Sequence, residues 1–217
     1  MMTLFSIPEV AASVHTPGPM RDALGELVGW GHGKKPISVR RAAKSDVDPI
    51  IKEHHYSGKP CPNSFCSLVV MYSDLGVQGA VQIGYGIRPK KKEPGVVEFD
   101  RMWLDDVMPK YSETIVLSLV HKYLKHAFPN IHTLRTYADT SAGNTGTIYR
   151  AANYTETKRL KADFYILPSG ERVHPVTMWH RHKTRAKAFL DVQYPGWKKA
   201  DGEQVQFEYQ LRKPPVK

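Results

Sequence analysis

The sequence predicts an α/β fold in which a central mixed β-sheet is flanked by helices. Residues 98–154 read as strand, loop, amphipathic helix, strand, glycine-containing loop and second helix. In one sheet this order implies two parallel strands joined by a crossover helix. Before them, the β-rich runs SFCSLVVMYS and GAVQIGYGI are joined around Asp74-Leu75-Gly76 and read as an antiparallel hairpin. A sheet with both kinds of strand pair is mixed.

Length and charge limit the classes of protein. The chain has 217 residues, 41% of them hydrophobic, so we expect one domain with a substantial core at residues 37–217. The formal net charge of +10 favours an anionic partner such as nucleic acid or a phosphorylated cofactor. No apolar run approaches the roughly 20 residues that a spanning helix needs, so we expect no membrane partner. Cys61 and Cys66 are too few for a disulfide framework, which indicates a reducing cytoplasm.

The first elements lead to a polar loop. Residues 1–36 carry prolines and the run WGHGKKP, and we expect an appendage or arm with a short helix at residues 20–28. ISVRRA follows as the first strand of the domain, and residues 43–55 form a helix with Ser45 as its cap. The loop HHYSGKPCPNS ends this helix and places three groups that can exchange protons at its end: His54, His55 and Tyr56.

Between the hairpin and the next strand lies a basic turn, RPKKKEPG. Its Arg88, Lys90, Lys91 and Lys92 are equally consistent with a solvated turn and with a loop that contacts phosphate, because short basic runs are common on protein surfaces. The charge of the turn alone does not separate these alternatives.

The crossover helix begins near Pro109, where Ser112 or Glu113 can meet its free amide groups, and stops at Phe128. Ligands of such folds bind where the strands end. Asp105 and Asp106 follow the first strand of the crossover. Asp139 follows the second strand, and in the helix after it Tyr149 and Asn153 can share a face.

The C-terminal part predicts a hairpin that turns at Pro168-Ser169-Gly170, and a last strand VQFEYQL. Between them lies the densest basic and aromatic segment of the chain, which we expect to bind nucleic acid rather than to be only a solvated face. The segment includes Trp179, and its candidate contacts are Arg172, Arg181, Lys183, Arg185 and Lys187. His180 and His182 lack a third ligand at a recognisable spacing, so we expect no metal site.

The order of elements is that of the GNAT acyltransferase fold. Three separated blocks of the chain resemble the Mom DNA-modification family of Mu-like bacteriophages: HHYSGKP, VEFDRMWLDD with PKYSET, and TYADTSAGNTGTIYRAANY. The resemblance spans residues 37–211 and leaves the amino-terminal arm uncovered. Several blocks in the right order are more specific than any one of them.

The resemblance implies conversion of the exocyclic N6 amine of adenine in double-stranded DNA to a carbamoylmethylated form, which protects phage DNA from host restriction. It also implies site residues: His55, Tyr56, Asp139 and Tyr149 for catalysis, and Arg101 and Ser112 for the cofactor. The group donor is acetyl-CoA or another activated acyl or aminoacyl unit. The run MPKYSET lacks the glycines of a typical acetyl-CoA pyrophosphate loop, so its backbone approaches an anion less closely.

The residue types suit this chemistry. Asp139 or His55 is able to take the proton of a weakly nucleophilic amine, and Tyr149 is able to protonate a leaving group. Arg101 is able to hold an anion. Each has an ordinary alternative: an Asp after a strand often caps a helix, a helical Tyr often packs, and a strand Arg often pairs with a carboxylate such as Glu98. We expect base flipping, with Tyr56 stacking on the extruded base.

Two other functions remain open from the sequence. The first is a GNAT N-acetyltransferase that acts on a small amine or a protein, and the second is a catalytically silent DNA-binding module. The excess of basic segments outside the crossover argues against the first alternative, and the set of His, Asp and Tyr side chains argues against the second.

Overall fold

The computed structural model describes residues 16–86 and 93–214. The chain divides into two compact units. Unit 1 comprises Met1–Thr136, Ile148–Thr155 and Glu208–Lys217, and unit 2 comprises Tyr137–Thr147 and Glu156–Phe207. Across the described residues, no helix has the length and apolar character needed to cross a membrane.

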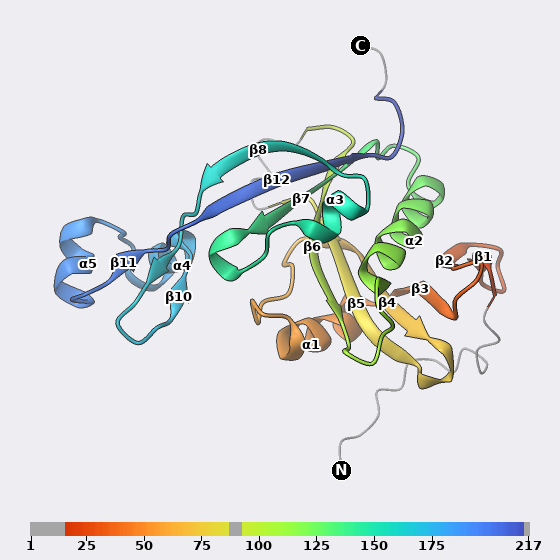
Figure 1. The fold of residues 1–217 in the computed structure, drawn as a ribbon, viewed down its shortest axis with the longest axis horizontal. Coiled ribbons are helices and arrows are strands. Elements are labelled where there is room, and N and C mark those ends of the chain that lie inside the picture. Colours follow the sequence, from red (N-terminus) through yellow and green to blue (C-terminus); the bar gives the residue numbers. More distant parts are fainter. Residues whose placement is uncertain (1–15, 87–92, 215–217) are drawn as a thin grey trace. The chain divides into compact units, whose positions relative to one another are not determined.

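A mixed sheet forms the centre of unit 1 (Figure 1). Its first strands are antiparallel to their neighbours in chain order: β1 (Gly18–Arg21), β2 (Leu27–Gly31), β3 (Ile37–Ala42), β4 (Ser64–Tyr72), β5 (Val77–Gly84) and β6 (Val96–Leu104). The short 3-10 helix η1 (Ser73–Leu75) joins β4 to β5, so the predicted hairpin is confirmed. The full strand order is β1-β2-β3-β4-β5-β6-β7-β12-β8, in which β7 is Thr133–Asp139, β12 is Glu203–Gln210 and β8 is Thr155–Lys161.

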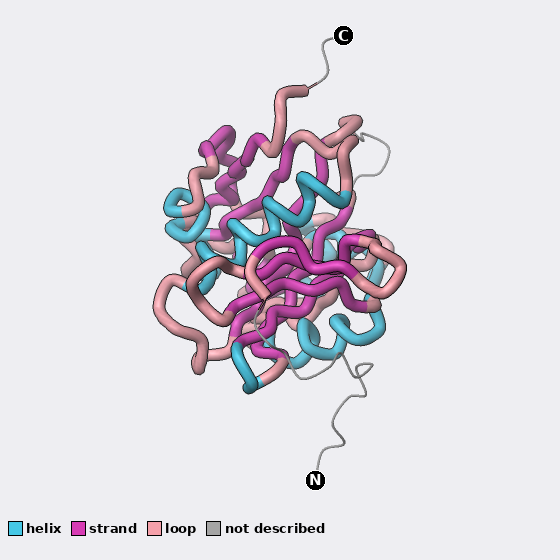
Figure 2. The backbone as a smooth tube through the Cα atoms, turned by 90° about the vertical axis from the view of Figure 1, so that its right-hand side faces the viewer, coloured by secondary structure: helices cyan, strands magenta, loops and turns pink. Residues whose placement is uncertain are grey.

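The crossover is also confirmed. β6 continues through α2 (Ser112–Ala127) into β7 (Thr133–Asp139), which is parallel to β6 with Val96 opposite Thr133. Helix α2 is amphipathic as expected: it buries Val116, Leu119, Val120 and Tyr123. The helix ends before Phe128 and packs against β2 and β3 (Figure 2). The expected cap is wrong: Tyr111 precedes the helix in a left-handed conformation, and Ser112 donates its hydroxyl to Pro109 O at 2.5 Å.

The prediction of a short helix at residues 20–28 is wrong. β1 and β2 pair there as a hairpin, and β2 pairs in turn with β3, with Gly29 opposite Arg40. Backbone pairing between segments distant in sequence therefore outweighs local helix propensity. Residues 1–15 of the expected arm lie outside the described residues, as do Arg88, Lys90, Lys91 and Lys92 of the basic turn.

Helix α1 (Lys44–His54) packs against β4, β5 and β6. Val47 and Ile51 lie on the apolar side of the helix and contact a cluster that includes Val69 and Ala80. The N-cap residue is Ala43, without a side-chain cap, so the assignment of Ser45 as the cap is wrong. The C-cap residue is His55, whose amide donates to Ile51 O, and this places the polar loop directly beside β6.

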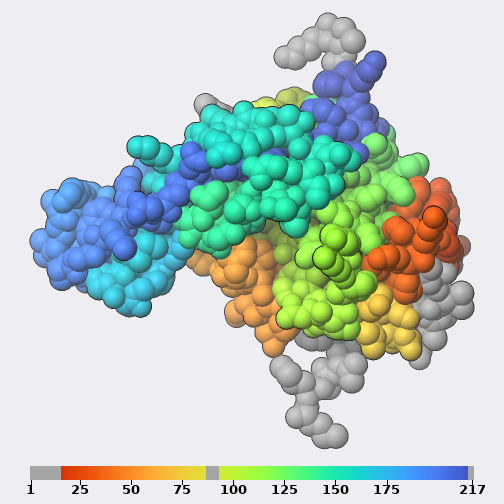
Figure 3. All heavy atoms as spheres, in the orientation of Figure 1, coloured from red at the N-terminus to blue at the C-terminus, as the bar shows by residue number. Residues whose placement is uncertain are grey.

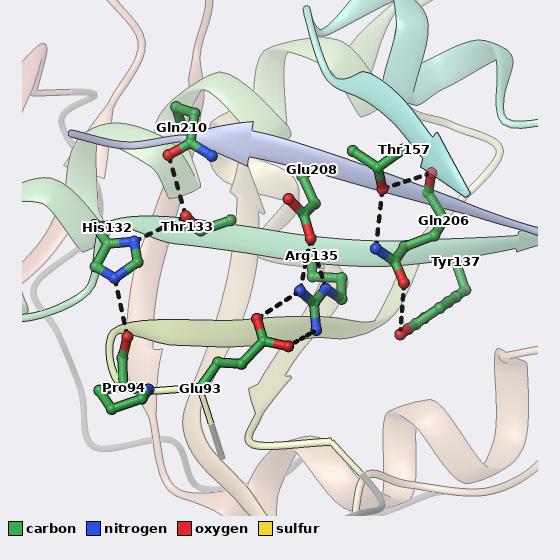
Figure 4. Close-up of polar contacts among 10 residues, drawn as sticks. All are labelled: Glu93, Pro94, His132, Thr133, Arg135, Tyr137, Thr157, Gln206, Glu208 and Gln210. Atoms are coloured by element: carbon green, nitrogen blue, oxygen red, sulfur yellow. Dashed lines mark hydrogen bonds and ion pairs between the residues drawn. The ribbon is translucent and has the colours of Figure 1, made fainter. Parts of the chain in front are cut away.

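The N-terminal part of β7 and the C-terminal part of β12 (Glu203–Gln210) belong to unit 1 (Figure 4). Arg135 on β7 donates from Nε to Glu208 Oε1 at 2.8 Å and from Nη2 to Glu93 Oε2 at 2.8 Å. Helix α3 (Thr147–Ala151) carries Tyr149. Asn153 lies beyond the end of this helix with φ +63°, so the shared helix face expected for Tyr149 and Asn153 is wrong.

Unit 2 has a core of its own. β9 (Tyr165–Ile166) pairs with β10 (Arg172–Val173) and β11 (Lys198–Lys199), which confirms the hairpin at residues 168–170. Helices α4 (Pro175–His182) and α5 (Lys187–Gln193), which the sequence did not reveal, cover this sheet, and their atoms form the closely packed blue group of Figure 3. The core side chains are Tyr165, Leu167, Val173, Met178 and Leu190.

The remaining elements of unit 2 follow the strand ends: η3 (Thr140–Ala142), most of β8 (Thr155–Lys161) and the first part of β12 (Glu203–Gln210). Within this unit Thr157 and Gln206 bond through their side chains, and Tyr137 donates to Gln206 Oε1 at 3.3 Å (Figure 4). The strand predicted from VQFEYQL is confirmed by β12.

Candidate active site

A bulge in β6 sets the direction of Arg101. Gln82 on β5 lies opposite Arg101 and Ile83 lies opposite Phe99, so Asp100 is the extra residue of the bulged strand. Bulges bend a strand and re-aim its side chains, often next to functional sites. The Arg101 guanidinium donates from Nε to Lys59 O at 2.8 Å and from Nη1 to Asp100 O at 2.7 Å. Both of these acceptors are main-chain carbonyls, and no ion pair between Arg101 and Glu98 is found among the described residues.

The loop after α1 brings His55 and Tyr56 to this arginine. The centroids of the two rings lie 4.4 Å apart, and Tyr56 is 70% exposed. Burial and the nearby positive charge of Arg101 lower the pKa of His55 to about 4. His55 is therefore neutral at physiological pH. Its neighbour His54 instead stacks on Trp103, with ring centroids 4.2 Å apart.

Tyr149 is the fourth member of the group. Its ring is buried, and burial raises the pKa of its phenol while a side-chain hydrogen bond with Thr136 opposes that effect. Tyr149 also interacts electrostatically with Tyr56 and Arg101. The structure therefore brings His55, Tyr56, Arg101 and Tyr149 together within unit 1 from three separate sequence blocks.

Sequence reasoning assigned no functional role to a thiol and two carboxyls that lie beside this group. Cys61 donates its Sγ hydrogen to Asp100 Oδ2 at 3.1 Å, and burial with the adjacent Asp100 charge raises the pKa of this thiol to about 12. Burial, with Asp100 as the next cause, raises the pKa of Glu98 to about 7. Glu98 fills the space beside Gly86, where a side chain would collide with the carboxylate. The only signal in the sequence was the Glu-Phe-Asp alternation before Arg101.

The start of α2 is the candidate place for a phosphorylated donor. Helix α2 has 16 residues, and among the described residues the amides of Glu113 and Thr114 have no acceptor. Such orphan amides at a helix start suit an anion. Tyr111 adopts φ +71° there, the conformation that glycine usually supplies. These residues fit a phosphate-bearing donor, with Ser112 buried at the same turn.

Asp139 belongs to unit 2 and is buried. Its Oδ1 accepts hydrogen bonds from Ser141 N at 3.0 Å and Ser141 Oγ at 2.5 Å, which caps η3. Its Oδ2 accepts from the Arg172 guanidinium, which also lies 3.9 Å from the Phe164 ring centroid. Asp139 therefore has the capping role of the ordinary alternative, in addition to any role in catalysis.

The basic segment contains two kinds of cation. Arg181 pairs with Glu171 at 2.5 Å and Lys187 with Asp191 at 2.6 Å. Lys183 and Arg185 are exposed and, within the described part of the chain, have no carboxylate within 4.0 Å. His182 is held by Tyr194 OH at 2.7 Å from Nε2. In the described residues, no group of three metal-ligating side chains forms.

Comparisons with known proteins identify the family and the fold of the chain. The sequence pattern of the Mom protein family matches residues 36–214. The methylcarbamoylase Mom of Escherichia phage Mu is 31% identical over 162 residues, which cover 71% of this chain and 66% of that protein, slightly under two thirds of its length. The solved structure of Salmonella typhimurium yncA, described as an acetyltransferase with its cofactor acetyl-CoA, superposes with a TM-score of 0.51.

The yncA match has 11% sequence identity and covers 83% of this chain and 96% of that one. At this identity the similarity concerns the fold alone. The chain therefore has the GNAT-like acetyltransferase fold that the order of its elements predicts.

Proposed function

Because the chain belongs to the Mom protein family, we propose that it modifies adenine in phage DNA, converting the exocyclic N6 amine to a carbamoylmethylated form. The modified base protects the phage genome from host restriction enzymes, and the enzyme works in the host cytoplasm. The observation that carries this proposal is the convergence of His55, Tyr56, Arg101 and Tyr149 in unit 1.

The amine of adenine is a weak nucleophile because its lone pair is delocalised into the ring. Its attack on the donor carbon therefore requires removal of one N6 proton as the new bond forms. Asp139 supplies the carboxylate for that proton. The bond between the donor carbon and its leaving group breaks in the same step, and Tyr149 gives the leaving group a proton. The raised pKa of Tyr149 keeps this phenol protonated until then.

Arg101 and Ser112 hold the donor. The donor is acetyl-CoA or another activated acyl or aminoacyl unit, and the two orphan amides at the start of α2 suit a phosphate on it. Acetyl-CoA lacks the nitrogen of a carbamoylmethyl group, so that product requires a nitrogen-containing unit such as an aminoacyl donor. When bound, such a donor supplies an electrophilic carbon. Arg101 is suited to an anionic group because its planar guanidinium donates along several directions at once.

Double-stranded DNA is the substrate. The chain carries a formal net charge of +10, and basic side chains release counterions from DNA when they neutralise phosphates. The contacts come from the segment that holds Arg172, Arg181, Lys183, Arg185 and Lys187. Chemistry on a stacked base requires that the base leave the helix, and the exposed ring of Tyr56 offers a stacking surface for it.

Mass spectrometry of nucleosides tests the proposal. DNA from cells that express the chain is hydrolysed and compared with DNA from cells that express the Arg101→Ala variant. We expect an adenine adduct with the mass of a carbamoylmethyl group in the first sample and its near absence in the second. An acetylated small amine or protein in place of modified DNA would contradict the proposal.

A further inference from the structure

The hydrogen bonds around His55 determine which of its ring nitrogens carries the proton. The amide of Ser57 points at His55 Nδ1 at 3.2 Å, and the Ser57 hydroxyl lies 2.8 Å from the same atom. A backbone N–H can only donate, so Nδ1 must present a lone pair. In a neutral imidazole the proton is then on Nε2.

This tautomer has a consequence for the chemistry of the site. A neutral imidazole accepts a proton only at its bare nitrogen, and in His55 that nitrogen is already bonded to Ser57. Nε2 instead carries an N–H that points away from the Ser57 contacts. His55 is therefore poorly placed to act as the base that removes the N6 proton.

Arg101 adds a second donor beside the first. Its Nε and Nη1 are bonded to main-chain carbonyls, while its Nη2 has no acceptor in the described part of the chain. His55 Nε2 likewise has no hydrogen-bond acceptor in the described part of the chain. The two side chains meet around Lys59 O, which accepts from Arg101 Nε at 2.8 Å and from the Ser57 hydroxyl at 3.4 Å. The same hydroxyl lies 2.8 Å from His55 Nδ1. Neither atom, Arg101 Nη2 nor His55 Nε2, is among the buried polar atoms of the described residues that lack a partner, so both reach solvent and are able to donate to a ligand.

We propose that His55 Nε2–H and Arg101 Nη2 form a two-donor site for a negatively polarised oxygen of the bound substrates, with Ser57 as the residue that fixes the His55 tautomer. The inference rests on the proposed function, since it assigns a role within that site. The oxygen belongs either to the transferred group, where negative charge develops in the transition state, or to a DNA phosphate. In either case two N–H groups donate hydrogen bonds to a negatively charged or polarised oxygen.

The tautomer is tested directly by nitrogen NMR of the full chain labelled with 15N-histidine, with His55→Gln used to assign the resonance. We expect a bare Nδ1 and a protonated Nε2 at neutral pH. A protonated Nδ1 would overturn the proposal. This readout needs no substrate, so it stands even if the chain modifies no DNA, and it separates failure of this inference from failure of the proposed function.

The role is tested by the rate at which modified adenine accumulates after induction. His55→Gln keeps an N–H donor of similar reach but has no basic nitrogen, and we expect its rate to stay within about tenfold of wild type. His55→Ala removes the donor and should lose about 100- to 1,000-fold. A His55→Gln variant as inactive as His55→Ala would mean that His55 is a base and would overturn the proposal, as would full activity of His55→Ala.

The source of the oxygen is read from DNA affinity. If the oxygen belongs to the transferred group, His55→Ala binds duplex DNA as tightly as wild type while its modification rate falls. If it belongs to a phosphate, DNA affinity falls with the rate. Ser57→Ala is the matched control, because it removes the hydroxyl but keeps the amide that holds Nδ1, and we expect it to retain the Nε2–H tautomer.

Discussion

The guanidinium of Arg172 pairs with the carboxylate of Asp139, the residue proposed as the base. The same carboxylate accepts two hydrogen bonds from Ser141 and caps η3. Asp139 thus joins a structural contact to a proposed chemical role, and a variant at this position changes both. Separating them requires a second variant that breaks the ion pair and leaves the carboxylate in place.

We expect Asp139→Asn to lower the accumulation of modified adenine by about 100- to 10,000-fold, because an amide oxygen cannot take the N6 proton. Asn caps helices nearly as well as Asp, so the melting temperature should fall only through loss of the ion pair. Arg172→Gln is the control. If Asp139 serves only to hold Arg172, the two variants lose the same activity, and the assignment as base is then wrong.

Tyr149→Phe removes one hydroxyl from a buried ring. The chain should remain folded and lose about 1 kcal/mol of stability through its hydrogen bond with Thr136. The modification rate should fall about 100-fold or more, because the leaving group loses its proton donor. Thr136→Val is the control, since it removes the same hydrogen bond from the other side, together with the bond that Thr136 Oγ1 donates to Phe99 O at 3.0 Å. If Tyr149→Phe and Thr136→Val have the same modification rate, the hydroxyl of Tyr149 serves only the structure and not proton transfer.

Much of the fold was predictable because its signals are local. The stripe of Val116, Leu119, Val120 and Tyr123 recurs at helical spacing, and the hairpin of β4 and β5 turns at a glycine. The helix at residues 20–28 was wrong because pairing with β3 decides that segment. Helices α4 and α5 were missed because eight and seven residues are too few for a clear periodicity.

The candidate site was predictable only through its family pattern. The resemblance identified His55, Tyr56, Arg101 and Tyr149, and the structure brings these four together. The contacts that surround these four residues were not predicted. Cys61 meets Asp100 across 39 positions of sequence, and Ser57 fixes His55 through a main-chain amide that no side-chain pattern encodes. Contacts of this kind depend on tertiary structure, so composition and spacing do not predict them.

The basic segment should bind DNA through its unmatched charges. The slope of log affinity against log salt is negative, and neutralising Lys183 and Arg185 together should make it shallower by about 1.8. This is the change expected for the loss of two phosphate contacts. Neutralising Arg181 and Lys187 should change it less, because Glu171 and Asp191 already pair with them. Titrations of a fluorescent duplex at several salt concentrations measure both slopes. If both double variants change the slope by the same amount, the ion pairs of Arg181 and Lys187 open on DNA. If neither variant changes the slope of wild type, this segment does not contact DNA.

Glu98 provides a prediction about pH. Burial raises its pKa in the folded chain from 4.5 to about 7, so folding favours the protonated carboxyl. The stability contributed by that preference is fully present below the unfolded pKa and is lost as pH rises through about 7. Glu98→Gln keeps the neutral shape at every pH. It should therefore raise the melting temperature relative to wild type in alkaline buffer and have little effect in acidic buffer.

The control for this effect is Glu26→Gln, at an exposed position in the turn between β1 and β2. It should leave the pH dependence of the melting temperature unchanged. Because Glu98 is only partly buried, solvent screening reduces the size of its effect but not its sign. A melting temperature of Glu98→Gln that follows wild type across the whole pH range would mean that Glu98 is ionised in the folded chain, stabilised by the Arg135 charge that opposes the shift.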